Sequence, residues 1–327
     1  MTCKPTISVI ICTRNRAAPL DRTLVSMEMM GPMPGVAWEL IVVDNGSTDG
    51  TQKTLERHRR LLPLKAVYHG EKGLSRARNR GVEEASGNWI VWTDDDVRVD
   101  PHWLQAYAQS FKDYPEAVVF GGPIEPELEG PRRPWMQNNL DVLRHALAAR
   151  EFGPFPVPLS LEDDRMPFGA NFAVRAAEQS ATLYDVNLGA GSGGSTVGEE
   201  TALIRELLGG GSTGMWVPGA RVRHIIPPER QSRSYVFDYY AGHGAADARR
   251  QGHWAKVPPW LLRRLVTRWA DYSARRLLPG RTDWVKPLVR YAYDCGYLKG
   301  VLTMRREARH GSAKAVGVRE AAGRVSG

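Results

Sequence analysis

Four short apolar runs in the first hundred residues, separated by stretches of helical character, constrain the fold of this 327-residue chain more than any other feature. Strands are expected at residues 7–12, 39–43, 64–68, 89–93 and 118–121. Helices are expected between the first four, at about residues 19–30, 49–60 and 75–84. Because fully apolar strands that alternate with helices belong to sheets covered on both faces, the sequence predicts an α/β fold with a mostly parallel sheet.

The composition indicates a globular protein, because 42% of the residues are hydrophobic and a chain of this length can bury a sizeable core. Cys3, Cys12 and Cys295 have no metal-ligand spacing, which argues against a zinc site and a disulfide framework. The sequence has neither a signal-type hydrophobic region before the first strand nor an apolar run of membrane-spanning length. We therefore expect a cytoplasmic protein, soluble or peripheral at the inner membrane face.

Charge is unevenly distributed along the chain, whose formal net charge is +8. Residues 249–310 contain 15 Lys and Arg against 4 Asp and Glu, a balance of +11, whereas residues 1–248 contain 26 against 31, a balance of −5. A basic C-terminal region on an acidic body indicates an anionic partner. The sequence leaves open whether this partner is a phosphate-rich substrate, a membrane surface or a nucleic acid.

Three carboxylates, Asp94, Asp95 and Asp96, directly follow the apolar run that ends at Thr93. Because alternate residues of a strand point to the same side, we expect Asp94 and Asp96 to face one pocket, and Asp95 to face away or to cap the following turn. Oxygen ligands of this kind select magnesium, manganese or calcium, and the first two usually arrive with a phosphate-bearing substrate. A solvated acidic turn is the alternative interpretation.

Polar side chains also follow the first two strands. Thr13 and Arg14 offer groups suited to a base edge or a diphosphate, and Asp44 offers a carboxylate suited to a nucleobase or ribose. Ligands of parallel sheets bind at the carboxyl ends of the strands, so Asp44 and residues 94–96 are expected to share one edge. The loop at residues 12–16 lacks Gly-x-Gly-x-x-Gly, which argues against a dehydrogenase.

The second half of the chain is expected to contain a helix at about residues 134–149 and a glycine-rich stretch at residues 189–198. This stretch is either a mobile loop over an active site or a flexible linker. Apolar residues then recur at helical spacing among arginines, at Leu261, Leu262, Leu265, Val266 and Trp269. The amphipathic helix that they predict either packs on the catalytic domain or lies on a bilayer.

Four motifs occur in one order and spacing, at residues 8–16, 41–51, 72–81 and 93–96. They read SVIICTRNR, IVVDNGSTDGT, KGLSRARNRG and TDDD. In this combination the chain resembles family 2 glycosyltransferases of the GT-A fold. The resemblance covers about residues 6–230.

The resemblance implies a Rossmann-like, mostly parallel sheet flanked by helices, in a catalytic domain at residues 1–230. A basic helical extension is expected at residues 231–310 and a disordered tail at residues 311–327. The implied activity is an inverting transfer of a sugar from a UDP- or dTDP-linked donor to a hydroxyl of a glycan, a lipid-linked molecule or a small molecule. Mn²⁺ or Mg²⁺ would stabilise the leaving diphosphate.

Site residues follow from the resemblance by their positions. The nucleotide is expected to contact Thr13, Arg14, Asp44, Lys72, Gly73, Asp94 and Asp95. The metal is expected to bind Asp96, Asp94 and His224. Glu200 is the expected general base and Glu199 the alternative, because relatives usually have Glu-Asp here. Both glutamates would also suit a helix N-terminus through its dipole.

The roles expected of four arginines near these motifs are less specific. Arg76 and Arg78 are expected on a solvated helix face. Arg230 and Arg233 either neutralise the diphosphate or lie on the surface.

Two competing functions belong to other classes. A sugar nucleotidyltransferase also uses a nucleotide-binding α/β sheet and a divalent ion, but it would be expected to have a glycine-rich phosphate loop after the first strand. A non-catalytic protein whose basic helices hold nucleic acid is the other alternative. We expect no nucleic acid partner, because the acidic sites would repel phosphate without a metal.

Overall fold

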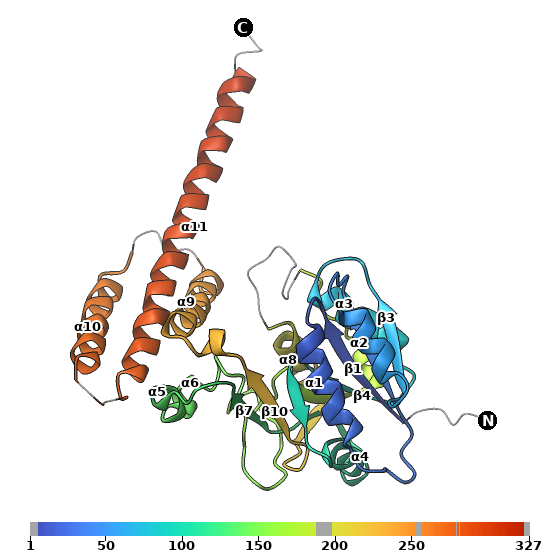
Figure 1. Cartoon of the computed structure of the whole chain (residues 1–327). Helices are drawn as coiled ribbons and strands as arrows, with labels where there is room; N and C mark the ends of the chain where they lie inside the picture. Colours follow the sequence, from blue (N-terminus) through green and yellow to red (C-terminus); the bar gives the residue numbers. More distant parts are fainter. Residues whose placement is uncertain (1–5, 188–197, 253–256, 279, 281, 324–327) are drawn as a thin grey trace. The chain divides into compact units, whose positions relative to one another are not determined.

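The computed structural model describes the chain except residues 1–5, 188–197, 253–256, 279, 281 and 324–327, and describes residues 309–323 by their backbone only. The chain divides into two compact units (Figure 1). The first comprises Met1–Glu127 and Leu147–Ile226, and the second comprises Leu128–Ala146 and Pro227–Gly327. The second unit thus includes a segment that the sequence places within the catalytic domain.

A seven-stranded sheet organises the first unit. In spatial order its strands are β3 (Leu64–Tyr68), β2 (Trp38–Asp44), β1 (Ile7–Thr13), β4 (Trp89–Thr93), β8 (Asn171–Arg175), β6 (Ala117–Gly121) and β9 (Thr213–Trp216). Strands β3, β2, β1 and β4 are parallel, β8 is antiparallel to both of its neighbours, and β9 is parallel to β6. The five predicted strands are present to within one residue at each end, and the predicted α/β class is confirmed.

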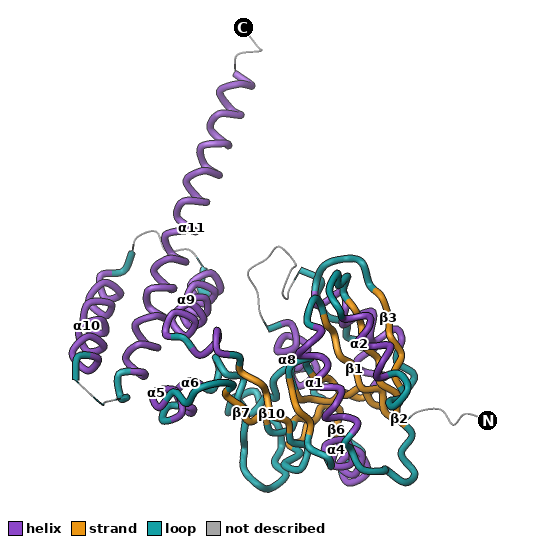
Figure 2. Tube along the Cα trace, viewed as in Figure 1, coloured by secondary structure: helices purple, strands orange, loops and turns teal. Residues whose placement is uncertain are grey.

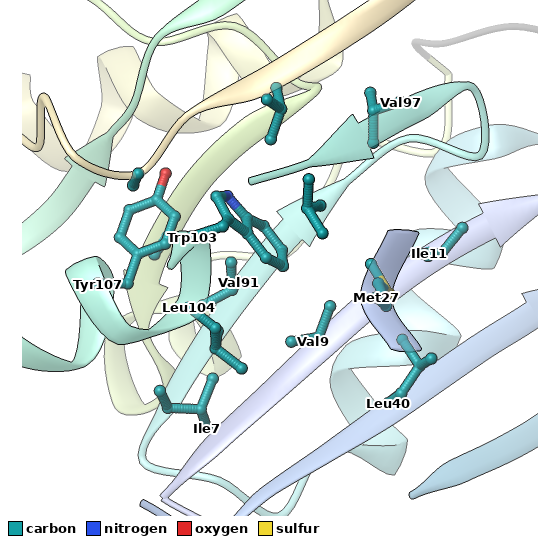
Figure 3. Close-up of a cluster of buried hydrophobic side chains, with 14 of the residues drawn as sticks. Ile7, Val9, Ile11, Met27, Leu40, Val91, Val97, Trp103, Leu104 and Tyr107 are labelled. Carbon is teal, nitrogen blue, oxygen red and sulfur yellow. The ribbon is translucent and has the colours of Figure 1, made fainter. Parts of the chain in front are cut away.

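Helices cover both faces of this sheet. They are α1 (Ala17–Glu28), α2 (Thr51–His58), α3 (Leu74–Glu84), α4 (Trp103–Asp113), α7 (Ala176–Ala181) and α8 (Glu199–Gly209). Val9 and Ile11 of β1 pack in a cluster with side chains of α1, α2 and α4, part of which appears in Figure 3. Ile10 packs on the other face with side chains of α3 and α8. Successive residues of β1 therefore serve opposite faces, which explains why the strand is apolar throughout.

A second, three-stranded sheet lies in the order β5 (Val97–Val99), β10 (Val222–Ile226) and β7 (Ile124–Leu128). Strand β5 begins directly after the three aspartates. His224 lies within β10, where it is the antiparallel partner of Val97. This pairing brings a residue from the end of the first unit beside the acidic turn.

The second unit is helical (Figure 2). Its main helices are α5 (Pro134–Gln137), α6 (Leu140–Leu143), α9 (Arg233–Arg250), α10 (Pro259–Arg276) and α11 (Val285–Gly323). The single helix predicted at residues 134–149 is wrong, because the chain breaks between α5 and α6. Asn139 donates hydrogen bonds from its side-chain amide to the carbonyl oxygens of Trp135 (2.8 Å) and Thr282 (3.1 Å). Such local bonds compete with a continuing helix.

Helices α9 and α11 approach each other at glycines. A Cβ on Gly244 would lie 2.0 Å from the carbonyl oxygen of Tyr293, and a Cβ on Gly296 would lie 1.8 Å from that of Ala241. Side chains of α10 pack on α11, where the buried Leu261 joins Tyr297. Helix α11 extends to Gly323. The disordered tail expected at residues 311–327 is not tested and stays a prediction. Among the described helices, none is long and apolar enough to cross a membrane.

Candidate active site

The carboxyl ends of β1, β2 and β4 gather polar residues at one edge of the large sheet. Thr13 and Asp44 are register partners at the ends of β1 and β2. The Thr13 hydroxyl donates a 2.7 Å hydrogen bond to Asp95 Oδ2, just beyond the end of β4. Asp44 and the three aspartates therefore share this edge, as the strand pattern predicts.

Asp94, Asp95 and Asp96 form a turn between β4 and β5. Arg16 bridges two of them, with Nε 2.8 Å from Asp95 Oδ1 and Nη2 2.6 Å from Asp96 Oδ2. The expectation that Asp95 faces away from the site or caps the following turn is wrong. The chain leaves strand geometry after β4, so the two-residue alternation no longer applies, and Asp95 points toward the end of β1.

Burial makes the negative charge of this turn costly. Asp95 and Asp96 are 6% and 7% exposed. Burial raises the pKa of Asp94 to about 6, with a further contribution from the Asp96 carboxylate. Burial also raises the pKa of Asp95 to about 7, although the Arg16 guanidinium acts in the opposite direction. A cation placed here would relieve this unfavourable burial of charge.

His224 faces the acidic turn from β10. Its Nδ1 lies 2.9 Å from the carbonyl oxygen of Leu147. A carbonyl can only accept, so Nδ1 donates and Nε2 is the nitrogen that faces Asp96 Oδ1, 3.5 Å away. Burial lowers the pKa of His224, but the contact with Asp96 outweighs it and the pKa is raised. A hydrogen bond from Nδ1 to a backbone carbonyl commonly orients a histidine whose Nε2 binds a metal.

The oxygen and nitrogen atoms of this turn suit a divalent cation, yet they do not form a closed cage. Within the described ranges, no group of three or more His, Cys, Asp or Glu side chains is arranged to hold a metal ion. Magnesium commonly binds one or two protein carboxylates and completes its shell with substrate phosphates and water. The expected set of Asp94, Asp96 and His224 stays a prediction, because it does not form a metal site by itself and a substrate phosphate would have to complete it.

Asp44 is fully buried and its carboxylate is already partnered. Oδ1 accepts a 2.8 Å hydrogen bond from the backbone N–H of Ser47, and Oδ2 accepts a 2.6 Å bond from the side chain of Gln52. These bonds hold the turn after β2 and the start of α2 in place. A carboxylate oxygen accepts more than one hydrogen bond, so Asp44 keeps the capacity to accept another.

Asn45 fixes the loop that carries Lys72 and Gly73. Its side-chain amide donates a 2.5 Å hydrogen bond to the carbonyl oxygen of Glu71 and accepts a 3.1 Å bond from the backbone N–H of Gly73. Gly73 is buried and has a φ of 138°, a conformation that favours glycine. Lys72 is exposed at the same loop. The sequence indicates only a turn at Asn45, so this role was missed.

A buried arginine holds the two candidate bases. Arg78 Nη1 lies 2.7 Å from Glu199 Oε1 and 3.4 Å from Glu200 Oε2. The expectation that Arg78 lies on a solvated face is wrong, since it is 5% exposed, whereas Arg76 is exposed. Residues two apart on a helix point to nearly opposite sides, so these two arginines cannot share a face.

The glutamates and the acidic turn belong to one site. Arg78 lowers the pKa of Asp94 and Glu200 raises it, although both effects are smaller than that of burial. Gly169 lies against Glu200 and Arg78, because a Cβ there would lie 3.2 Å from the Glu200 side chain and 3.3 Å from Arg78 Nη2. A larger residue at this position would require these two side chains to shift.

The sequence predicts the carboxylates of this site but not the arginines that bind them. Arg16 lies in the first motif, just after the end of a strand, and this position could have indicated that it belongs to the site. Arg230 and Arg233 belong to the second unit. The glycine-rich stretch lies outside the described residues except for Gly198, which precedes α8.

A family model described as "Glycosyl transferase family 2" matches residues 8–172, just over half of the chain. The chain belongs to glycosyl transferase family 2. The matched region contains all four motifs and the acidic turn.

Relatives in this family match part of the chain. It is 34% identical over 120 residues to validoxylamine A glucosyltransferase of Streptomyces hygroscopicus subsp. limoneus, a match that covers 36% of this chain and 26% of that protein. It is 30% identical over 125 residues to the dolichol-phosphate mannosyltransferase of Pyrococcus furiosus, which covers 36% and 35%. The matches therefore span only about a quarter to a third of these relatives.

Two solved structures have a similar fold. S. aureus TarS 1–349 superposes with a TM-score of 0.51 at 16% identity, covering 92% of both chains. Mannosyltransferase PcManGT from Pyrobaculum calidifontis, in complex with GDP-Man and Mn²⁺, gives a TM-score of 0.50 at 20% identity and covers 96% of this chain and 81% of that one. The similarity confirms the GT-A fold expected from the motifs.

Proposed function

We propose that this family 2 chain transfers a sugar from a UDP- or dTDP-linked donor to an acceptor hydroxyl, with inversion at the sugar carbon. The observation that carries the proposal is that one sheet edge combines two groups of carboxylates, the acidic turn and the glutamates on Arg78. Buried carboxylates with raised pKa values in a ligand-binding edge are typical of catalytic sites. The acidic turn serves the donor and the glutamates serve the acceptor.

The donor nucleotide binds at the ends of β1 and β2. Thr13, Arg14 and Asp44 contact the nucleoside, and the loop of Lys72 and Gly73 lies along the diphosphate. Asp44 and Gly73 are both buried and fixed by hydrogen bonds, so this part of the site is formed before the donor arrives. Preorganisation of this kind lowers the cost of binding.

Asp96, Asp94 and His224 are the residues that would hold Mn²⁺ or Mg²⁺. When bound, the ion supplies Lewis-acid stabilisation of the charge that develops on the leaving diphosphate. Arg16, which pairs with Asp95 and Asp96 in this structure, competes for the same oxygens and is a phosphate partner once released from them. The similar structure from P. calidifontis contains Mn²⁺, which supports the choice of ion.

Glu200 is the better candidate for the base. Glu199 accepts hydrogen bonds from Arg78 and from the backbone N–H of Gly198 (3.1 Å), and its side chain is 3% exposed. The Glu200 side chain is 18% exposed and lies farther from Arg78. A base must reach the acceptor hydroxyl, and Glu200 is the more accessible. The hydroxyl oxygen bonds to the sugar carbon as the diphosphate leaves from the opposite face, so one base suffices and the configuration inverts.

Calorimetric titration of UDP, dTDP and GDP, each with and without Mn²⁺, tests the donor half of the proposal. Asp96→Ala is compared with Asp113→Ala, which removes an exposed carboxylate at the end of α4. We expect Mn²⁺-dependent binding of UDP or dTDP by the wild type and by Asp113→Ala, and its loss in Asp96→Ala. Absence of binding by all three nucleotides would refute the proposal.

The competing functions find less support. Residues 13–16 contain no glycine, so the phosphate loop expected of a nucleotidyltransferase is missing after β1. Much of the basic charge expected to bind nucleic acid is paired within the second unit. Arg268 contacts the buried Asp294 at 2.8 Å, and Arg275 contacts Asp271 and Asp283.

One face of α10 supports an anionic membrane as a further partner. Leu261 is buried, whereas Leu262, Val266 and Trp269 are 50%, 65% and 54% exposed. Their spacing of four and three residues places them on one side of the helix. The face that contains Leu261 packs on α11, within the second unit. The exposed face, with Arg263 beside it, is the one that would lie on a bilayer. Packing of this helix on the catalytic domain stays a prediction.

A further inference from the structure

The second unit contains a cavity of about 570 Å³ that the transfer chemistry does not use. Its lining includes residues of α5, α10 and α11, together with the start of α9 and the preceding η1 (Pro228–Gln231). All of these segments belong to the second unit, so the cavity is formed within it. A volume of this size is typical of small-molecule sites.

Aromatic rings form much of the cavity wall. Tyr272 and Tyr291 are nearly parallel, with ring centroids 6.5 Å apart and planes at 11°. Phe237 lies 6.0 Å from Tyr291, and Trp135, which also lines the cavity, lies 5.3 Å from Trp284. Trp135, Phe237, Tyr272 and Tyr291 are all half-buried, so their rings are partly accessible. Flat apolar surfaces of this kind accommodate the C–H face of a sugar ring.

Two guanidinium groups give the same cavity a positive charge. Arg133 and Arg233 line it, and no acidic residue lines it in the part of the chain that the structure describes. Arg133 Nε is buried and has no hydrogen-bond partner among the described residues. A buried donor without a partner is unfavourable. Guanidinium groups favour phosphate because they bind it with two parallel hydrogen bonds.

We propose that this cavity binds a phosphate-bearing sugar. The inference goes beyond the proposed transferase function, because all residues that line the cavity belong to the second unit. The aromatic wall takes the sugar ring and the two arginines take the phosphate. A free sugar phosphate and a phosphodiester-linked glycan present the same chemistry to this site.

Calorimetric titration of the full chain, without donor or metal, tests the cavity directly. The probes are glucose 6-phosphate, its methyl phosphodiester, glucose and inorganic phosphate. Arg133→Ala and Arg233→Ala are compared with Arg132→Ala, which removes an exposed arginine next to the cavity lining. Arg233 is exposed, so its replacement should leave the fold intact even if Arg133→Ala unfolds.

We expect glucose 6-phosphate to bind the wild type and Arg132→Ala equally, and to bind Arg133→Ala and Arg233→Ala at least tenfold more weakly. Glucose and inorganic phosphate should each bind at least tenfold more weakly than glucose 6-phosphate. Binding of the phosphodiester as well indicates a linked glycan, and binding of glucose 6-phosphate alone indicates a free sugar phosphate. Either result supports the proposal.

No binding of glucose 6-phosphate, or equal binding by the Arg132 and Arg233 variants, would overturn the inference. Inorganic phosphate that binds as tightly as glucose 6-phosphate would overturn the sugar part of it. Asp96→Ala is measured alongside, and it should retain sugar phosphate binding while losing nucleotide binding. The two proposals can thus fail separately, because one titration reports on the second unit and the other on the first.

Discussion

Arg78 and Glu199 form a buried ion pair across 121 residues of sequence, with Nη1 2.7 Å from Oε1 and side chains that are 7% and 3% exposed. The pair joins α3 to the first residue of α8. It therefore sets the position of the adjacent Glu200 against the carboxyl edge of the sheet. Such a pair fixes the orientation of its two side chains. Removal of one partner leaves the other charge buried without a counterion.

Replacement of Arg78 by methionine should destabilise the first unit strongly. The variant buries Glu199 without its cation, a change that typically costs about 3–5 kcal/mol. Urea unfolding should show this loss, whereas Arg76→Met, on the exposed side of the same helix, should change the free energy of unfolding by less than about 0.5 kcal/mol. Equal losses of unfolding free energy in the two variants would show that the ion pair does not stabilise the fold.

Glu200→Gln should abolish most of the transfer activity without loss of the fold. Removal of a general base lowers kcat by about 10²- to 10⁴-fold. Initial rates should show this for Glu200→Gln, while Glu206→Gln, an exposed position on the same helix, stays near wild type. A folded Glu199→Gln variant that loses more activity than Glu200→Gln would transfer the role to Glu199.

Asn171 should be among the least replaceable polar residues of the first unit. Its side-chain amide makes hydrogen bonds of 2.7–2.9 Å with four buried groups, Trp103 Nε1, Tyr107 Oη, the carbonyl of Pro123 and the carbonyl of Ala220. Asn171→Ala leaves all four without a partner, at about 1–3 kcal/mol each before relaxation. We expect a loss of at least about 3 kcal/mol in chemical unfolding, against little change for the exposed Asn88→Ala.

Cys12 should resist alkylation in the folded protein. Burial raises the pKa of its thiol to about 12, with smaller contributions from the nearby Asp94 and Asp95 carboxylates. The thiolate is the reactive form, so at pH 8 almost no reactive species is present, and the rate should rise about tenfold per pH unit until the pH reaches that pKa. Peptide mapping after iodoacetamide treatment measures this. Labelling of Cys12 at the same rate in the folded and the urea-unfolded chain would contradict the expectation.

The exposed face of α10 should bind anionic vesicles. We expect the wild type to pellet with phosphatidylglycerol vesicles at low salt and much less at high salt, because exposed arginines contribute to the attraction. Trp269→Ser should weaken binding about tenfold, since it removes a large apolar side chain from the interface. Leu302→Ser, an exposed apolar position on α11, is the matched control. No pelleting at low salt would exclude this surface as a membrane contact.

The local patterns of the sequence predict the large sheet well. Strands β3 and β4 have the predicted bounds. The alternation of apolar strands with helices depends on residues that are close together in the sequence, so a sequence pattern can predict it. Asp44 and the aspartates were placed at one edge by topology alone. Burial of Arg78 depends on α8, which comes more than a hundred residues later. The place of His224 near Asp96 was expected only from the family resemblance, because it depends on β10, which is also more than a hundred residues away. Such contacts leave no periodic signal in the sequence.

Asp95 shows a second limit of sequence patterns. Its orientation was expected from strand alternation, but the chain turns after β4 and Arg16 draws the side chain inward. The break between α5 and α6 has a similar origin, because the side chain of Asn139 bonds to backbone carbonyls. In both places a specific side-chain contact overrides the regular pattern.

Proton NMR of UDP- and dTDP-linked sugars incubated with the protein and Mn²⁺, with water or an added hydroxyl compound as acceptor, tests the inverting transfer most directly. We expect release of the nucleoside diphosphate from at least one α-linked donor, with the β-anomer of the sugar formed first. Chelation of the metal, Asp96→Ala and Glu200→Gln should each suppress the signal. Formation of the α-anomer first, or no cleavage of any donor, would contradict the assignment of this site as an inverting glycosyltransferase.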